Sequence, residues 1–163
     1  GGFSHKPNQD AVLFLYHDIM PLVWKKNKHI KVTIVGSYPT KDMLDLNSDR
    51  FKVLGYVEDI SEYFNTSRVF VAPLRYGAGV KGKIGQSLEY GLPLVTTPIG
   101  AEGFDFKAQA DHVIDTTAQG LANKILKLYQ DETVWEEVSE ASKEVLEPFS
   151  ISHIEEQVLK VLK

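Results

Sequence analysis

Cysteine is absent from this sequence, so disulfide bonds and thiolate metal sites are excluded. No uninterrupted apolar run approaches the roughly 18 residues that a membrane-spanning helix needs. The 5 histidines are scattered without the spacing of metal ligands, and no Ser–His–Asp pattern of a hydrolase is present. The lack of cysteine is compatible with a reducing cytosol.

The chain has no excess of positive charge either. Its formal net charge is −4, which argues against nucleic acid as the main partner. With 163 residues, 43% hydrophobic and 25% charged, it is long enough for one domain with a substantial core and has an ordinary globular composition. The local cluster of Arg75, Lys81 and Lys83 therefore indicates a site rather than a basic surface.

The sequence begins with Gly1 and Gly2 instead of methionine, and its glycine-led segment 1–8 follows no strand. We therefore expect a fragment of a larger protein, in which the strand before this segment is cut away or barely retained. Helical spacing of apolar residues then predicts a helix over residues 10–24, with Asn8 or Asp10 as its cap.

The most informative stretch begins with the apolar run 69–74, which is typical of a buried strand. Gly77, Gly79 and Gly82 follow it, and a helix is predicted from about Lys81 to Gly91. A strand, a glycine loop and a helix in this order present free backbone N–H groups and the positive end of the helix dipole to an anion. The stretch therefore predicts a diphosphate site.

The remaining elements predict the fold class. The helix after the glycine loop should present Ile84 and Leu88 on one face. Further strands are predicted at residues 30–36, 51–57, 92–95 and 112–114, and further helices at 41–46, 59–64, from Thr117, from Glu132 and after the capping box of Ser152 and Glu155. Apolar strands that alternate with helices indicate a parallel sheet covered on both faces. The expected fold is a Rossmann-like three-layer α/β/α sandwich.

The same stretch carries a family resemblance. Its loop matches the pattern Pro-Leu-x-x-Gly-Ala-Gly-Val-Lys-x-Lys at residues 73–83, and residues 86–95 are similar to Glu-Ala-Met-Ala-x-Gly-x-Pro-Val-Val. Over nearly its whole length the chain resembles the C-terminal, donor-binding half of a retaining glycosyltransferase of family 4, which has the two-domain GT-B fold. The resemblance implies a single donor-binding domain over residues 1–163, with the N-terminal acceptor domain outside this sequence.

The resemblance also implies an activity. Such an enzyme, here hexosyltransferase-like, transfers a sugar from a nucleotide diphosphate sugar of the UDP or GDP type to an acceptor, with retained configuration. It needs no metal ion and no cofactor, and its partners are the nucleotide sugar and its own N-terminal domain. The isolated domain is expected to be inactive, and no catalytic residue is assigned. The implied location is cytoplasmic, with peripheral membrane contact only through the missing domain.

Residue by residue, the resemblance assigns contacts to each part of the donor. The assigned contacts are Gly79, Val80, Lys81, Gly82, Lys83 and Arg75 for the diphosphate, Gln86 for the ribose, Tyr56 and Val57 for the base, and Gly2, His5 and Asn8 for the donor-side loop. Each assignment has a structural alternative. The lysines can be solvated at a helix start, the arginine paired with a surface carboxylate, the tyrosine laid over the sheet edge, and the loop residues used to cap a helix.

Two departures from the family pattern leave a second function open. Ala78 and Gln86 replace two glutamates that family members carry eight positions apart, and Phe3 and Asn8 stand where Arg and Lys are common. An amide still hydrogen-bonds a diol, but it forgoes a charge-assisted bond. The alternative is a non-catalytic nucleotide- or protein-binding module derived from a degenerate transferase.

Overall fold

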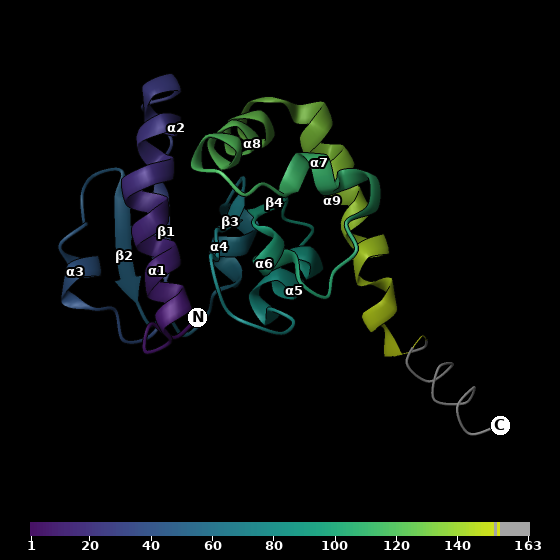
Figure 1. The fold of residues 1–163 in the computed structure, drawn as a ribbon, viewed down its shortest axis with the longest axis horizontal. Helices are drawn as coiled ribbons and strands as arrows, with labels where there is room; N and C mark the ends of the chain where they lie inside the picture. The colour runs from purple at the N-terminus through teal and green to yellow at the C-terminus, as the bar shows by residue number, and fades with distance from the viewer. Residues whose placement is uncertain (152, 154–163) are drawn as a thin grey trace.

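Parallel strands form the framework of the computed structural model, which describes residues 1–151 and 153. β1 (Val32–Val35) pairs with β2 (Phe51–Gly55), and β3 (Phe70–Ala72) pairs with β4 (Leu94–Thr96), both in parallel. Figure 1 shows the two pairs as separate sheets. Thr96 adds a single parallel bridge to Ile114. Within the described residues, β1 and β3 do not pair with each other.

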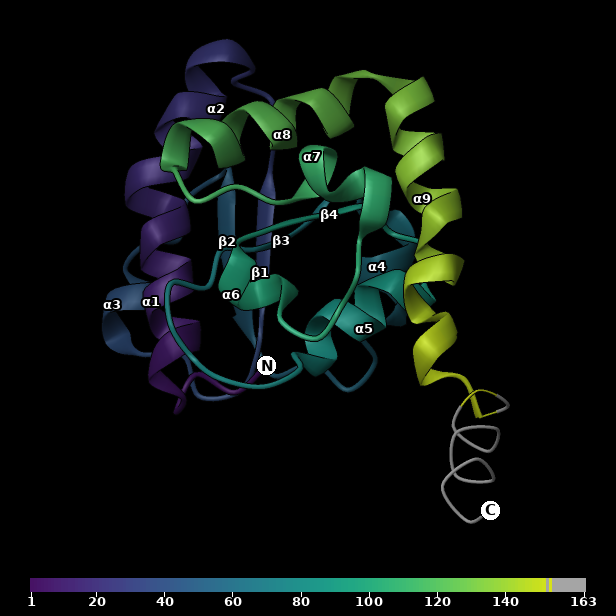
Figure 2. The ribbon, with the colours of Figure 1, turned by 45° about the vertical axis from the view of Figure 1, so that its right-hand side comes forward.

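Helices connect these strands and cover them. The helices are α1 (Lys6–Phe14), α2 (Met20–Lys26), α3 (Lys41–Leu44), α4 (Ser61–Thr66), α5 (Gly82–Glu89), α6 (Pro98–Ala101), α7 (Ala110–Val113), α8 (Ala118–Gln130) and α9 (Glu132–Leu146), with 3-10 turns at Lys107–Gln109 and Glu147–Phe149. α2 packs against α8, and α5 and α8 pack against α9 (Figure 2). The domain is therefore Rossmann-like with α/β/α layers, as predicted. None of its described helices is long and apolar enough to cross a membrane.

The N-terminal helix begins earlier than predicted and contains a π-helical turn, Leu15–Ile19, between α1 and α2. His5 is the N-cap residue and makes no side-chain capping bond, so the predicted caps at Asn8 and Asp10 are wrong. Pro7 lies in the first turn, where its fixed φ suits a helix and its missing N–H costs no hydrogen bond. The chain is thus helical from Lys6 onward.

The predicted strand at residues 112–114 is wrong. Residues Ala110–Val113 form α7 instead, closed by a bond from Ile114 N–H to the carbonyl oxygen of Ala110 at 2.8 Å. This turn buries Val113 completely, and Ile114 alone pairs with Thr96. Three residues carry too little periodicity to separate a strand from one helical turn.

Other predicted features are confirmed. α5 buries Ile84 and Leu88, and Gly91 follows it with a φ of 61°, a left-handed conformation that suits glycine. Thr117 caps α8 by accepting from Gly120 N–H, and α9 begins at Glu132. The predicted capping box of Ser152 and Glu155 lies outside the described residues.

Two threonine hydroxyls join the end of β4 to the end of β3. Thr96 Oγ1 donates to the carbonyl oxygen of Ala72 at 2.7 Å, and Thr97 Oγ1 donates to that of Leu74. Both threonines are buried, so each bond contributes about 1 kcal/mol and its loss costs more. Thr97 also accepts from Gly100 N–H at 3.1 Å, which begins α6. These bonds fix the backbone at Leu74, the residue after which the glycine loop begins.

Gly100 lies where no side chain fits. A Cβ atom there would be 1.9 Å from Thr96 Oγ1 and 3.2 Å from the carbonyl oxygen of Ala72. Gly100→Ala is therefore expected to break the buried bond between them and to lower the free energy of unfolding by about 2 kcal/mol or more. Urea unfolding measures the change, with Gly82→Ala as the control, because a Cβ at Gly82 meets no atom within 4 Å. Equal effects of the two substitutions would contradict this packing.

Candidate functional site

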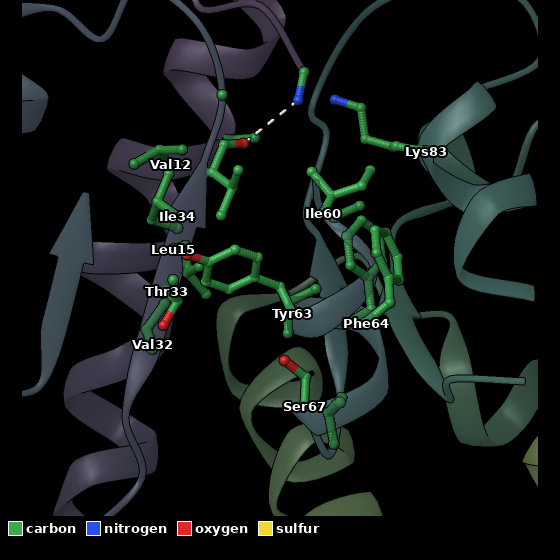
Figure 3. Close-up of a pocket in the computed structure, with 18 of the residues that line it drawn as sticks. Val12, Leu15, Val32, Thr33, Ile34, Ile60, Tyr63, Phe64, Ser67 and Lys83 are labelled. Atoms are coloured by element: carbon green, nitrogen blue, oxygen red, sulfur yellow. Dashed lines mark hydrogen bonds between the residues drawn. The ribbon is translucent and has the colours of Figure 1, made fainter. Parts of the chain in front are cut away.

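A cavity of about 880 Å³ lies between β1 and β3 and reaches the carboxyl ends of these strands (Figure 3). Ligands of doubly wound parallel sheets bind in a crevice at this edge. The cavity brings together half of the residues that the sequence assigned to donor binding. Those that line it are Gly2, Asn8, Tyr56, Val57, Lys83 and Gln86. They come from the N-terminal loop, the first turn of α1, the end of β2 and α5.

Lys83 lies in the first turn of α5 and lines the cavity (Figure 3). Its Nζ donates to Asn8 Oδ1 at 2.5 Å, and Asn8 Nδ2 donates to the carbonyl oxygen of Gly2 at 2.8 Å. Burial, and then the positive charge of Lys81, lower the pKa of Lys83 below its usual 10.5. No carboxylate among the described residues forms an ion pair with Lys83. A partly desolvated ammonium with a neutral partner favours an anionic ligand.

The start of α5 is open to an anion as well. Lys81 is its N-cap residue, no side chain of the described part of the protein caps the helix, and the N–H groups of Gly82 and Lys83 precede the first intrahelical bonds. Gly79 has a φ of 80°, and a Cβ atom at Gly79 or Gly82 would meet nothing within 4 Å. The backbone of this loop therefore has room for a ligand to approach its N–H groups.

Two of the three basic residues are held by carboxylates from other segments. Lys81 Nζ lies 3.1 Å from Glu102 Oε2, and its side chain is only 12% exposed. Arg75 Nε donates to Asp10 Oδ2 at 2.9 Å, Nη2 donates to Oδ1, and the guanidinium lies 4.7 Å from the ring centre of Phe14. Neither Lys81 nor Arg75 lines the cavity. For Arg75, the observed contact is the surface-carboxylate pair given above as the alternative.

The remaining predicted residues lie at the edge of the cavity or outside it. Gln86 lines the cavity one helical turn after Lys83, and the ring of Tyr56 is largely exposed, with 74% of its surface in solvent. His5, Val80 and the two loop glycines do not line the cavity. Among the described residues, no group of three or more His, Asp or Glu side chains is arranged to hold a metal ion.

The sequence analysis missed the acidic partners Asp10 and Glu102. They lie 65 and 21 residues from the basic residues that they bind, so no local spacing points to them. Ser37, which lies two residues after the end of β1 and lines the cavity, was not among the assigned donor contacts. Its position at the carboxyl edge of a predicted parallel strand is the signal that could have included it.

The parallel strands, the glycine loop and the open helix start define a Rossmann-like domain with a cavity at the carboxyl ends of its strands. Residues 1–131 match the family described as Glycosyl transferases group 1, so the chain belongs to this family. No curated protein sequence matches the chain significantly.

Similar solved structures are GT-B glycosyltransferases. One is the crystal structure of TarM, which a second similar structure identifies as TarM of S. aureus. It has a TM-score of 0.77 and 21% sequence identity, and the match covers 94% of this chain and 32% of TarM. Anabaena HepE in complex with UDP-glucose has a TM-score of 0.70 and 18% sequence identity. The match covers 90% of this chain and 44% of HepE. A third is the C-terminal domain of LpcC, a glycosyl transferase group 1 family protein from Francisella tularensis. It has a TM-score of 0.69 and 12% sequence identity, and the match covers 87% of this chain and 79% of that domain.

At these identities the likeness shows the fold alone. The chain spans about a third of TarM and less than half of HepE. It corresponds to one half of a GT-B fold.

Lys83→Met is expected to change how stability depends on pH. Because folding lowers the pKa of Lys83, the unfolded chain binds more protons between the folded and unfolded pKa values. The cost of burying the charge is therefore full at neutral pH and is lost as the pH rises toward 10.5. The unfolding free energy of the variant, minus that of the wild type, should fall over this range.

Urea unfolding at several pH values measures this difference. Lys25→Met, at an exposed lysine in the last turn of α2, is the matched control and should show a constant difference from the wild type. A constant difference for Lys83→Met as well would mean that the ammonium is solvated.

Proposed function

We propose that the chain is the C-terminal, donor-binding domain of a retaining glycosyltransferase of family 4, and that the rim of its cavity holds a nucleotide diphosphate sugar. One observation carries the proposal: the Lys83 ammonium, without a carboxylate partner among the described residues, lies at the uncapped start of α5 beside the cavity. Family membership supports sugar transfer. The HepE complexes with UDP-glucose and UDP support a nucleotide sugar, and the likeness to the C-terminal domain of LpcC supports the domain assignment.

In this proposal the diphosphate lies against the first turn of α5. The N–H groups of Gly82 and Lys83, with the Gly79–Val80 loop, donate to phosphate oxygens, and the Lys83 ammonium supplies positive charge. When the sugar departs, the diphosphate gains negative charge, and fixed donors stabilise that charge more in the transition state than in the ground state. The site supplies this stabilisation without a metal ion or cofactor.

The nucleoside extends from the diphosphate toward the end of β2. Gln86 follows Lys83 by three positions and so shares its helix face, where its amide can both donate to and accept from the ribose hydroxyls. The exposed ring of Tyr56 offers a stacking surface for the base, and the backbone at Val57 offers polar contacts. Gly2 and His5 lie in the donor-side loop, and Asn8, in the first turn of α1 that follows it, orients the ammonium of Lys83.

The reaction itself belongs to the longer protein. The share of TarM and HepE that this chain covers, 32% and 44%, leaves room in the remainder for an N-terminal domain that holds the acceptor. Positioning of reactants supplies about 7–11 kcal/mol in well-oriented systems, so a chain without the acceptor site binds the donor and transfers no sugar. A cytoplasmic location, with membrane contact only through that other domain, completes the proposal.

A non-catalytic nucleotide- or protein-binding module is the second candidate. Two observations favour it. Lys81 and Arg75 are neutralised by Glu102 and Asp10, and Gln86 lacks the charge of the usual glutamate. Both would reduce the affinity for a diphosphate nucleotide relative to that of an active transferase.

Lys83→Ala tests the diphosphate site. Loss of a charge-assisted hydrogen bond costs about 1.5 kcal/mol or more, so the affinity for UDP and GDP should fall by about tenfold or more. Isothermal titration measures the affinity, and circular dichroism checks the fold. Lys25→Ala removes an exposed lysine and should bind as the wild type does. Equal binding by the two variants would refute the site, and no binding by the wild type would favour the non-catalytic module.

Gln86 is tested through the ribose. If its amide contacts the hydroxyls, 2′-deoxyuridine diphosphate should bind more weakly than UDP, and Gln86→Glu should widen the gap because its bonds are charge-assisted. Gln119→Glu, at a residue of α8 that does not line the cavity, controls for the added charge. Competition titration with the two nucleotides gives the ratio. Equal binding of both nucleotides would show that Gln86 does not contact the ribose.

A further inference from the structure

One short helix, α6, holds both ends of the glycine loop. The loop leaves Leu74, whose carbonyl oxygen accepts from Thr97 Oγ1. It reaches α5 at Lys81, whose ammonium pairs with Glu102. Thr97 and Glu102 are the residues directly before and after α6, and α6 and α5 are neighbours in Figures 1 and 2. α6 therefore connects the first residue of the loop to the last.

The segment that follows α6, residues 102–104, packs against the start of α5, and we call it the brace. Gly103 has a φ of 88°, and a Cβ atom there would lie 2.5 Å from Val80 Cγ2. A Cβ atom at Gly85 of α5 would lie 3.6 Å from the ring of Phe104. The brace thus approaches the backbone of the loop and of the helix closely, and a side chain at position 103 would prevent this approach.

The ion pair of Lys81 with Glu102 is the charged contact of the brace. Lys81 Nζ lies 3.1 Å from Glu102 Oε2 and also donates to the carbonyl oxygen of Gly79 within the loop. The side chain of Lys81 is only 12% exposed, although lysine is among the residues least often buried. Its ammonium is therefore directed to the brace and the loop, and it does not line the cavity.

The backbone of Lys81 determines where α5 begins. Its carbonyl oxygen accepts from Ile84 N–H at 2.8 Å and from Gly85 N–H at 3.3 Å, which are the first bonds of the helix. The N–H groups of Gly82 and Lys83 precede these bonds, so no intrahelical bond uses them. Because the side chain of Lys81 is fixed to the brace, the direction of these two N–H groups is fixed as well.

We infer that Glu102 is a positioning residue for the diphosphate: through Lys81 it holds the start of α5 in the orientation in which the N–H groups of Gly82 and Lys83 meet phosphate oxygens. The inference rests on the proposed function for the identity of the ligand. Lys81 then holds the loop and does not bind phosphate, in contrast to the contact that the family resemblance assigned to it. Donors that are fixed before the reaction stabilise the developing charge without reorganising.

The sign of one substitution separates the two roles of Lys81. Glu102 is negatively charged and lies near the proposed position of an anion, so removing its charge should strengthen anion binding by electrostatics alone. The same substitution would free Lys81 to bind phosphate. If Glu102 instead positions the loop, its removal should weaken binding. The two roles therefore predict opposite changes in affinity.

Titration calorimetry with UDP measures this change for Glu102→Ala, Lys81→Met and the double variant. Each single substitution should weaken binding by about threefold or more, and the double variant should bind no more weakly than the weaker single variant, because both remove one contact. Asp45→Ala is the matched control and should bind as the wild type does, since it breaks an exposed ion pair with Lys41 outside the cavity. Equal or stronger binding by Glu102→Ala would overturn the inference.

Hydrogen exchange without nucleotide tests the hold on α5 separately. The amides of Ile84 and Gly85 donate to the carbonyl oxygen of Lys81, so their exchange reports whether the start of the helix is fixed. Glu102→Ala should speed exchange at both by about threefold or more, and the amide of Ile125 inside α8 should be unaffected. Unchanged exchange at Ile84 and Gly85 would contradict the positioning role.

Gly103→Ala tests the brace without changing a charge. The added Cβ atom would meet Val80 and strain the positive φ, so the end of the loop should shift and UDP should bind more weakly. Gly91→Ala controls for backbone strain, because Gly91 has the same left-handed conformation, with a φ of 61°, and does not line the cavity. Equal affinities of these two variants would show that the brace does not position the loop.

These measurements separate failure of the inference from failure of the proposed function. If the wild type binds UDP and Glu102→Ala binds it equally well, the nucleotide site stands and the positioning role is wrong. If the wild type binds neither UDP nor GDP, the proposed function is wrong, and inorganic pyrophosphate replaces UDP in the same comparison. Weaker pyrophosphate binding by Glu102→Ala would then support the inference, and no pyrophosphate binding by the wild type would overturn it.

Discussion

Parallel pairing of the strands is the constraint on which the rest of the structure depends. Because β1 runs parallel to β2 and β3 runs parallel to β4, each strand needs a helical crossover before the next, which produces the layers of helices. The same pairing sends the segments after β1, β2 and β3 out at one edge. Ser37, Tyr56 and Leu74, after which the glycine loop begins, therefore line one cavity there, although they are far apart in the sequence.

The three basic residues near this edge are not equivalent. Lys81 and Arg75 each have a carboxylate partner, so an incoming anion must compete with Glu102 or Asp10 for them. Lys83 is partly desolvated and bonded to the neutral amide of Asn8, so the cost of removing its water has already been met during folding. An anion therefore gains most at Lys83. The partner of each basic residue, more than the basic residue itself, decides which of the three contributes to anion binding.

The sequence predicted those parts of the fold that depend on local pattern. The apolar runs became β1 to β4, and the helix after the glycine loop buries Ile84 and Leu88 and is followed by Gly91, because periodicity and glycine conformation act over a few residues. The short segment 112–114 was assigned to the wrong class because three residues hold too little periodicity.

Features that depend on distant partners could not be predicted in this way. Lys83 was correctly expected in the first turn of a helix, yet its contact with Asn8 lies 75 residues away. The pairing of Arg75 with Asp10 and the unpaired edges of β1 and β3 likewise arise only when separate segments meet in space.

The π-helical turn at Leu15–Ile19 has a further consequence. Met20 N–H bonds to the carbonyl oxygen of Leu15, five residues back, so the turn holds one residue more than an α-helix would. Everything after it is rotated by about 100°. Ala11 and Val12 before the turn and Met20 after it line the same cavity, and Val23 is fully buried in α2, which packs against α8. The extra residue is a phase shift that keeps Met20 on the cavity side of one unbroken helix, and a one-residue deletion there would rotate the buried face of α2 away without altering one of its side chains.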